Sequence, residues 1–467
     1  MSSFSTRILS GIKRLVVVAL IASGLGLLAF GPRAGEELPK DCVIVDYWEK
    51  WTGDEEAGMH QIVDDFNTTV GRKEHIYVRY LSTSSIEQKT LVAIAAGTPP
   101  DVAGLYNQDI PQYGALDSLQ PLDDLAAEHG ITAQMYKKVF WDECHYDGHL
   151  YGLVSSAYDV ALYYNTHIFR QSASALEARG LDPQRAPRTI AELDQYAQAL
   201  DRFDPSGRIT LAGYLPMEPG WYLNYTCIWF GGSWWNNAEH KFTFTDPGVV
   251  NSFKWIQSYS DRLGPTAVND FRSGFGTIDS PQNAFLTPSV AMVQQGTFFA
   301  HFIHRQNPSM DGHWAAAPFP SALPNLRDVT YCNCDVLVIP RGARHQKEAF
   351  EFIAFVNRQD EMEKLANLHC KISPLAKVSE GFLAHSNNPY IRVFDRLAAS
   401  PNAHPTEPIP ILPEVNDELN DFEQQLQLQQ VSPEEGLRQV QVRLQQKYDQ
   451  FMEDQRQRRK QHGQTAF

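Results

Sequence analysis

Strand and helix signals alternate near the start of the chain, and this alternation constrains the fold more than any other feature. Residues 42–47, 76–80 and 101–105 are apolar runs of strand length. Between the first two, residues 59–66 place apolar side chains at the i, i+3, i+4 and i+7 spacing of an amphipathic helix. A second helix follows a capping box at residues 84–87. This order predicts an α/β fold with a parallel sheet covered by helices.

Polar and aromatic residues follow the first and third predicted strands. They are Trp48, Glu49, Trp51, Tyr106, Asn107 and Gln108. Ligands of such sheets bind at the carboxyl ends of the strands. An indole face covers the C–H groups of a sugar ring, while carboxylates and amides bind its hydroxyls. The set therefore predicts a sugar-binding edge; the other interpretation is that Trp48 and Trp51 only cover the edge of the sheet.

The middle of the chain has a dense aromatic run. Seven aromatic residues stand between Gly220 and Trp235: Trp221, Tyr222, Tyr225, Trp229, Phe230, Trp234 and Trp235. Most of such a run is expected to form the core of a second lobe. Trp234 and Trp235 closely follow the Gly231-Gly232 pair, whose flexibility makes these two the best candidates to face a cleft. Trp221 is a further ligand candidate.

Further helices and one strand are expected in the rest of the chain. Thr189 and Glu192 are expected to cap a helix. Residues 335–339 form an apolar strand, followed by a helix that carries apolar residues from 349 to 356. Residues 414–447 are rich in Gln and Leu and helical in character, and the polar, charged residues 455–467 are expected to form a frayed tail.

The N-terminus has the pattern of a secretory signal. Arg7, Lys13 and Arg14 precede an apolar stretch at residues 15–30. Pro32 makes the cleavage site poor, so residues 1–35 are predicted to be a signal peptide or a retained N-terminal anchor. Export makes the six cysteines candidates for one or two disulfides. Their spacing lacks a Cys-x-x-Cys pair, so no metal site is predicted.

Charge and motif content exclude several function classes. The net charge of −15 argues against a general nucleic-acid binder, which needs a concentrated basic surface. The sequence has no Gly-x-Ser-x-Gly elbow, His-Glu-x-x-His helix or Gly-Lys-Ser/Thr phosphate loop. His301 and His304 lack a nearby carboxylate and are interpreted as polar surface or groove residues. We therefore predict no catalytic residue, metal or cofactor, although carboxylates brought together from distant loops would leave a hydrolase open.

Six fragments carry a family resemblance. They are Tyr47-Trp48-Glu49, Ile62-Val63-Asp64-Asp65-Phe66-Asn67, Ala96-Gly97-Thr98-Pro99-Pro100-Asp101-Val102, Tyr163-Tyr164-Asn165, Ala291-Met292-Val293-Gln294-Gln295-Gly296 and residues 335–342. In order and spacing the chain resembles extracellular solute-binding proteins of the maltose-binding type (family 1), which serve ABC sugar importers. The resemblance implies a two-lobed, type II periplasmic-binding-protein fold. Lobe 1 would comprise 41–157 and 335–372, lobe 2 158–334 and 373–450, and 451–467 would be a polar tail.

The resemblance also implies site residues and a role. Tyr158 and Asp159 would contribute from the hinge, and Phe298 stands where family members often have a Trp that stacks on sugar. The implied protein is monomeric, periplasmic or otherwise extracytoplasmic. It captures a sugar or sugar derivative between its lobes and delivers it to ABC permease subunits in the inner membrane. Two alternatives remain: a carbohydrate-active hydrolase or lyase, and a binding protein for a signalling receptor.

Overall fold

The computed structural model describes residues 38–461. The segment 1–35, predicted to be a signal peptide or anchor, lies outside the described residues. Within the described part, none of the helices combines the length and the apolar character needed to span a membrane.

Parallel strands and covering helices form the first lobe, as the sequence predicts. β1 (Val43–Glu49) pairs in parallel with both β2 (Ile76–Ser82) and β3 (Val102–Tyr106). Helix α2 (Gly53–Thr68) buries Met59, Ile62, Val63 and Phe66, the residues of the predicted apolar face. Helix α14 (Gln346–Val356) is the predicted later helix, and its Phe352 ring lies 5.3 Å from that of Tyr47.

The start of the next helix differs from the prediction. Helix α4 (Ile86–Ala95) has Ser85 as its N-cap, and this residue makes no side-chain cap hydrogen bond. Its φ of 54° lies in the left-handed region, so the turn leading into α4 has a different geometry from a capping box. The predicted box at residues 84–87 is therefore wrong, although the helix itself is present.

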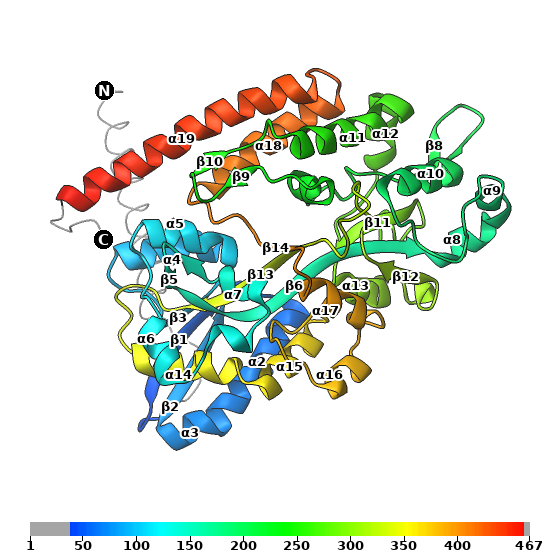
Figure 1. The fold of residues 1–467 in the computed structure, drawn as a ribbon. Coiled ribbons are helices and arrows are strands. Elements are labelled where there is room, and N and C mark those ends of the chain that lie inside the picture. The colour runs from blue at the N-terminus through cyan, green and yellow to red at the C-terminus, as the bar shows by residue number, and fades with distance from the viewer. Residues whose placement is uncertain (1–37, 462–467) are drawn as a thin grey trace, which may run out of the picture.

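Two long strands carry the sheet from the first lobe into the second (Figure 1). β6 (Gly152–Asn165) pairs along its first half with β13 (Thr330–Val338) and along its second half with β11 (Val290–Gly296) and β12 (Trp314–Ala317). β13 in turn pairs with β3 of the first lobe. One ten-stranded sheet therefore runs through both lobes. Eight of its strands follow the order β2-β1-β3-β13-β6-β11-β8-β7, and β12 and β14 (Ala403–His404) pair with β6 and β13 beside this path.

The second lobe surrounds the far end of this sheet. β8 (Ile209–Tyr214) pairs in parallel with β11, and β7 (Arg202–Phe203) forms the edge. Helix α10 (Ile190–Leu200) begins where the sequence predicts, since Thr189 Oγ1 accepts a hydrogen bond of 3.1 Å from Glu192 N–H.

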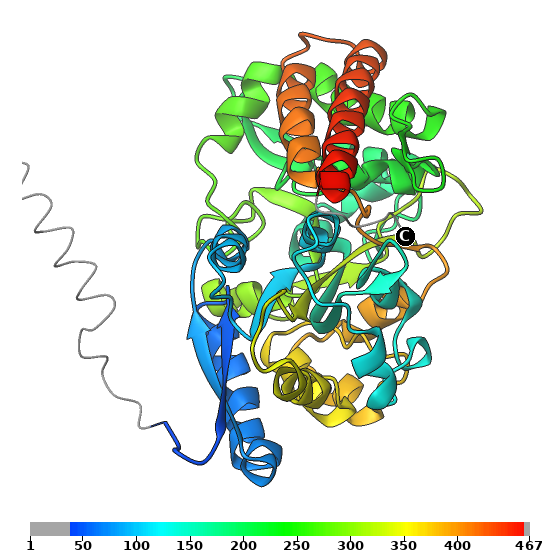
Figure 2. The same ribbon diagram turned by 90° about the vertical axis from the view of Figure 1, so that its left-hand side faces the viewer.

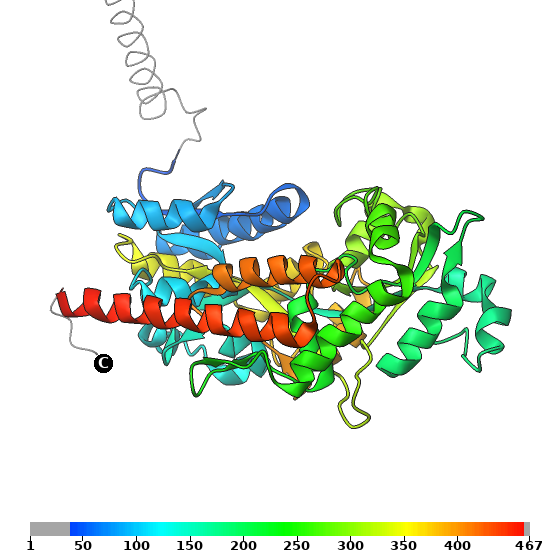
Figure 3. The same cartoon turned by 90° about the horizontal axis from the view of Figure 1, so that it is seen from above.

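Two C-terminal helices lie side by side on the second lobe (Figure 2). They are α18 (Leu412–Gln427) and α19 (Pro433–Gln461), and both contact α11 (Pro247–Leu263). α19 projects from the second lobe over the first (Figures 1 and 3). Because α19 continues to Gln461, the prediction of a frayed segment from residue 455 is wrong for residues 455–461. Phe451 and Met452 are still half-buried against the core, which explains why the helix continues despite its polar composition.

The remaining elements are short. Those near the site are η1 (Asn107–Asp109), α5 (Ile110–Ala115), α7 (Lys138–Asp142), β4 (His145–Tyr146), β5 (His149–Leu150), η3 (Leu223–Phe230), β9 (Trp235–Asn236), β10 (Lys241–Phe242), α13 (Phe299–Gln306) and α15 (Gln359–Leu368). The others are α3 (Val70–Glu74), α6 (Asp123–Glu128), η2 (Ala133–Met135), α8 (Thr166–Gln171), α9 (Ala173–Glu177), α12 (Pro265–Arg272), η4 (Pro308–Met310), α16 (Glu380–His385), α17 (Ile391–Ala398) and β14 (Ala403–His404).

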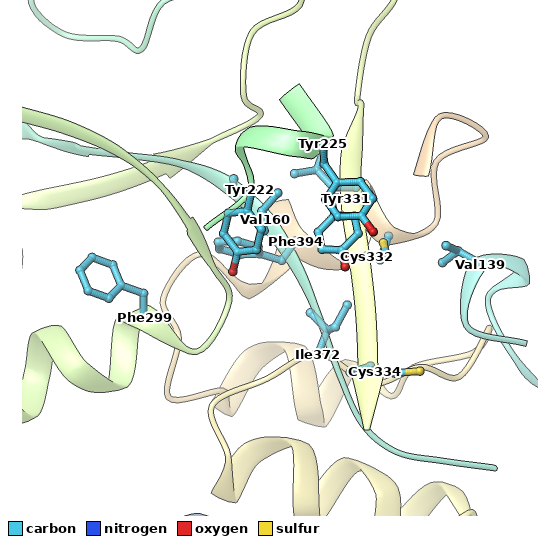
Figure 4. Packing of buried hydrophobic residues seen from close by; sticks show 14 of the residues in the cluster. Val139, Val160, Tyr222, Tyr225, Phe299, Tyr331, Cys332, Cys334, Ile372 and Phe394 are labelled. Atoms are coloured by element: carbon cyan, nitrogen blue, oxygen red, sulfur yellow. The ribbon is translucent and has the colours of Figure 1, made fainter. Parts of the chain in front are cut away.

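Buried side chains fill the junction between the lobes (Figure 4). The Tyr225 and Tyr331 rings stack there with their centroids 4.0 Å apart, close to Cys332. All six cysteines are free thiols, so the predicted disulfides are absent from the structure. Burial raises the pKa values of the Cys332 and Cys334 thiols, which keeps both protonated within the apolar core.

Candidate functional site

A cavity of about 950 Å³ lies between the two lobes and is called the cleft below. The first lobe contributes Trp51, Glu55, Tyr106, Gln108 and Lys371 to its wall, and the crossing strands contribute Tyr158, Tyr331, Asn333 and Asp335. The second lobe contributes Trp221, Tyr222, Arg272 and Phe298, together with Asn416, Asn420, Glu423, Gln424 and Gln427 of α18. Aromatic, amide and charged groups therefore share one concave surface.

Half of the predicted site residues line the cleft. They are Trp51, Tyr106, Gln108, Tyr158, Trp221 and Phe298. The Phe298 ring meets the Tyr158 ring edge-on, with the centroids 5.0 Å apart, so the hinge strand and the start of α13 present a joined aromatic surface. Trp221 has 48% of its surface exposed, whereas most other residues of its aromatic run are buried.

Trp48 lies elsewhere because of strand alternation. In β1, Tyr47 and Glu49 are buried on one face, so Trp48 points to the opposite face and is half-buried against the core. It does not line the cleft. Trp51, two residues beyond the end of β1, is free of this alternation and lines the cleft.

Trp234 and Trp235 belong to the core of the second lobe, which corrects their predicted position at the cleft. Trp234 is 1% exposed and stacks on Phe244 at 5.5 Å, while the Trp235 ring lies 5.1 Å from that of Tyr448. The preceding glycines are not a flexible joint. A Cβ on Gly232 would come within 2.7 Å of the backbone nitrogen of Val249, so glycine here allows a close approach to α11.

Three other predicted residues also lie outside the wall of the cleft. Glu49 is fully buried and accepts hydrogen bonds from the Tyr47 hydroxyl (2.6 Å) and the Lys50 backbone N–H (2.7 Å). Asp159 is fully buried and accepts a hydrogen bond from the Thr297 hydroxyl (2.9 Å), and burial raises its pKa. Asn107 lines a neighbouring cavity. The structure gives Glu49 and Asp159 supporting contacts inside the protein.

A buried network of charges lies at the wall of the cleft. Lys371 Nζ lies 2.8 Å from Glu55 and 3.4 Å from Asp335, and Lys50 Nζ lies 3.0 Å from Asp335 and 3.3 Å from Glu49. Burial alone would raise the pKa of Asp335, but Lys50 and Lys371 hold this pKa below its usual value. Each lysine is thus shared between two carboxylates, and the carboxylates are oriented as acceptors.

The sequence did not predict Lys371, Asp335 or the polar row of α18 as site residues. This row comprises Asn416, Asn420, Glu423, Gln424 and Gln427. Lys371 and Asp335 are 36 positions apart and meet only because β13 passes beside the segment after α15. The polar row of α18 could have been predicted from its helical spacing. Asn416, Asn420 and Glu423 follow the i, i+4, i+7 spacing of one helix face, directly beside the buried stripe of α18. Burial raises the pKa of Glu423 to about 8, so its carboxyl is mostly protonated at pH 7 and can donate a hydrogen bond.

His369 holds Trp51 at the wall of the cleft. Its ring lies edge-on to Trp51 with the centroids 4.6 Å apart, and its Nε2–H donates to the carbonyl oxygen of Glu55 at 2.9 Å. Burial and the nearby Lys371 ammonium lower the pKa of His369 to about 4. The imidazole therefore stays neutral in the folded protein at physiological pH.

The neutral His369 predicts an acid-sensitive stability. Between its folded pKa of about 4 and the usual value of about 6.5, the unfolded chain binds a proton that the folded chain does not. Stability is therefore expected to fall as the pH drops below about 6.5, by about 3 kcal/mol near pH 4. Urea unfolding at several pH values should show this loss, and His369→Gln should remove it. His60→Gln, at an exposed position of α2, should retain it; equal pH slopes for wild type and His369→Gln would contradict the assignment.

The described residues contain no group of three or more His, Cys, Asp or Glu side chains arranged to hold a metal ion. His301 of α13 instead lies 3.1 Å from Asp54 of α2, and Arg305 pairs with the same carboxylate. These contacts join the second lobe to the first.

Comparison with known proteins identifies the family. A model of the bacterial extracellular solute-binding proteins matches residues 61–384. The chain belongs to this family. Among curated proteins, the sn-glycerol-3-phosphate-binding periplasmic protein UgpB of Pectobacterium atrosepticum is 22% identical over 282 residues. The match covers 57% of this chain and 56% of UgpB, so the chain spans about half the length of the curated relative it matches.

Solved structures of solute-binding proteins share the fold. CpMnBP1 with mannotriose bound has a TM-score of 0.72 and 24% identity, over 86% of this chain and 99% of that one. The sugar-binding protein MalE of Xanthomonas citri has a TM-score of 0.72 and 18% identity, over 91% and 100%. These similarities establish the two-lobed α/β fold that the sequence predicts. The family and these neighbours are substrate-binding proteins.

Proposed function

We propose that this solute-binding protein captures an uncharged sugar or oligosaccharide in the cleft and delivers it to an ABC importer. One observation carries the proposal: aromatic rings from both lobes surround a set of carboxylates and amides. Tyr106 of the first lobe and Trp221 and Phe298 of the second offer exposed or half-buried ring faces, and the α18 amides and Asp335 offer groups that bind hydroxyls. A sugar ring presents both kinds of surface at once.

The charge pairing argues for an uncharged ligand. The relative UgpB is named for sn-glycerol-3-phosphate, a phosphate ester. A cavity that binds a phosphate ester needs cationic side chains that are not already paired with carboxylates. Among the described residues, the cations lining the cleft are Lys371 and Arg272. Lys371 is paired with Glu55 and Asp335, and Arg272 lies 3.0 Å from Glu218. The mannotriose and MalE neighbours are named for sugars, which agrees with this charge balance.

The proposal extends to partners and place of action. The protein acts as an exported monomer in the periplasm or another extracytoplasmic space, held by its N-terminal segment if that segment is retained. It meets permease subunits of the inner membrane and neither nucleic acid nor a cofactor. We propose binding without catalysis, because the matching family and the structural neighbours are substrate-binding proteins.

We also keep the predicted lobe boundaries, 41–157 with 335–372 and 158–334 with 373–450, as part of the proposal. The crossing of β6 and β13 between the lobes supports them. A ligand that touches both lobes would favour the closed arrangement, because it binds that state better than the open one.

Trp221→Ala is the direct test of the site. Its ring is 48% exposed at the cleft, so we expect a loss of about 2 kcal/mol in sugar binding, roughly thirtyfold, with little change in stability. Titration calorimetry against a panel of neutral glycans measures the affinity, after mass spectrometry of co-purified ligand selects the sugar. Phe203→Ala is the matched control, because Phe203 is 52% exposed on β7 and does not line the cleft. Equal affinities for the two variants, or turnover of the glycan, would contradict the proposal.

A further inference from the structure

An ion-pair cluster crosses from the first lobe to the second beside the cleft. Asp54 Oδ2 of α2 lies 3.1 Å from Nε2 of His301 in α13, and the Arg305 guanidinium contacts the same carboxylate oxygen. These three residues are called the clasp below. Asp54 and His301 are 247 positions apart in the sequence, so only the approach of the two lobes brings them together.

The sequence places each charge of the clasp where its own helix favours it. Asp54 stands in the first turn of α2, and Arg305 stands in the last turn of α13. The amino end of a helix stabilises negative charge and the carboxyl end stabilises positive charge. His301 precedes Arg305 by four residues, so both side chains lie on one face of α13. The pairing between the lobes therefore requires no unfavourable placement of a charge within either helix.

The two helices of the clasp also build walls of the cleft. Glu55, the neighbour of Asp54 on α2, lines the cleft from the first lobe. Phe302, the neighbour of His301 on α13, lines the cleft from the second lobe. A motion that separates these two walls therefore also separates Asp54 from its two partners.

The clasp is exposed to solvent, which suits it to opening and closing. The side chains of Asp54 and Arg305 are 51% and 55% exposed, and water can hydrate both ions when they part. An exposed pair of this kind shifts an equilibrium by about two- to fivefold. The clasp therefore favours one arrangement of the lobes without locking it.

We propose that the clasp regulates the release of ligand from the cleft by stabilising the closed arrangement of the lobes. The proposal rests on the proposed function and adds to it a device that sets how long the sugar stays bound. A sugar held between two walls leaves when the walls separate, so an interaction that is present only while they are together slows release. The clasp acts through the lobes and needs no contact with the ligand.

The release rate of a neutral sugar tests the clasp. The probe is the tightest-binding member of a panel that contains mannose, maltose and their oligosaccharides up to the hexaoses. Rapid dilution of the complex, followed by tryptophan fluorescence, measures the rate. Asp54→Asn should release the sugar about two- to fivefold faster than wild type. Arg305→Gln should also speed release, and the double variant should be little faster than Asp54→Asn, because the ion pair is already broken.

Salt gives a second readout, because an uncharged sugar has no long-range electrostatic attraction of its own. In about 1 M NaCl the Debye length falls to about 3 Å, so wild-type release should approach the rate of Asp54→Asn. Asp65→Asn is the matched control. Asp65 lies on the same helix and pairs with Lys364 of α15, within the first lobe. This control should keep the wild-type release rate and its dependence on salt.

The outcomes distinguish the clasp from the proposed function. Equal release rates for wild type and Asp54→Asn at low salt would overturn the clasp and leave sugar binding standing; Arg305→Gln gives the same comparison if Asp54→Asn does not fold. Absence of binding by every member of the panel would overturn the proposed function. Small-angle scattering of the unliganded proteins then decides on the clasp, since Asp54→Asn should have a larger radius of gyration than wild type and Asp65→Asn. Equal radii would overturn the clasp as well.

Discussion

Replacing Trp234 with alanine should lower the free energy of unfolding by about 3–5 kcal/mol and leave the sugar affinity of the folded protein unchanged. Trp234 is 1% exposed and stacks on Phe244 with an angle of 3° between the rings, so its loss leaves a cavity in the second lobe. The sequence favours the opposite result, because a tryptophan just after two glycines suggests an exposed loop. Denaturant unfolding and calorimetry on the same sample give the two quantities.

Trp221→Ala provides the matched comparison for Trp234→Ala. Both changes remove an indole from the same aromatic run, but Trp221 is exposed at the cleft. The Trp221→Ala variant should bind sugar more weakly with an unchanged free energy of unfolding. The Trp234→Ala variant should lose stability and keep its sugar affinity. A Trp234→Ala protein with wild-type stability and weakened binding would reverse the assignment of these two residues.

Lys371→Met should also have a large effect, on stability and binding together. Lys371 is 5% exposed and is shared between Glu55 and Asp335. Removing it leaves the buried Asp335 carboxylate with only Lys50, and breaking a buried pair in this way typically costs 3–5 kcal/mol, so we expect about that loss in the free energy of unfolding. Because Lys371 also lines the cleft, sugar affinity should fall as well.

An exposed ion pair serves as the control for Lys371→Met. Lys73 pairs with Glu74 at 2.9 Å, but its side chain is 82% exposed, so Lys73→Met should leave stability nearly unchanged. Lys371→Met/Asp335→Asn should recover part of the lost stability, since it removes the carboxylate that would be left short of a partner. Equal unfolding free energies for wild type and Lys371→Met would contradict the buried network.

Local periodicity was sufficient for much of the fold. The apolar spacing at 59–66 gave α2, the strands at 42–47 and 76–80 paired in parallel, and Thr189 capped α10 as predicted. These features depend on side chains a few positions apart, whose relation to one another is set by the helix or strand repeat. The family motifs, read in order, extended the prediction to two lobes.

The site was predictable only in part, because it depends on where each strand ends and on what the chain meets later. Trp48 and Trp51 look alike in the sequence, but Trp48 lies inside β1 and follows its alternation, whereas Trp51 lies beyond its end. Trp221 and Trp234 likewise belong to one run, but Trp234 packs on Phe244 and Tyr225 in the core, whereas Trp221 stays exposed at the cleft.

The sequence by itself determined the local elements, the α/β class and the kind of side chains available to bind a sugar. The tertiary structure alone decided the pairing of Lys371 with Glu55 and Asp335, the amide face of α18 at the cleft and the position of α19 over the first lobe. The physical reason is distance along the chain. Contacts within a helix or strand repeat are set by backbone geometry, whereas contacts between remote segments depend on how all the elements bury their apolar faces together.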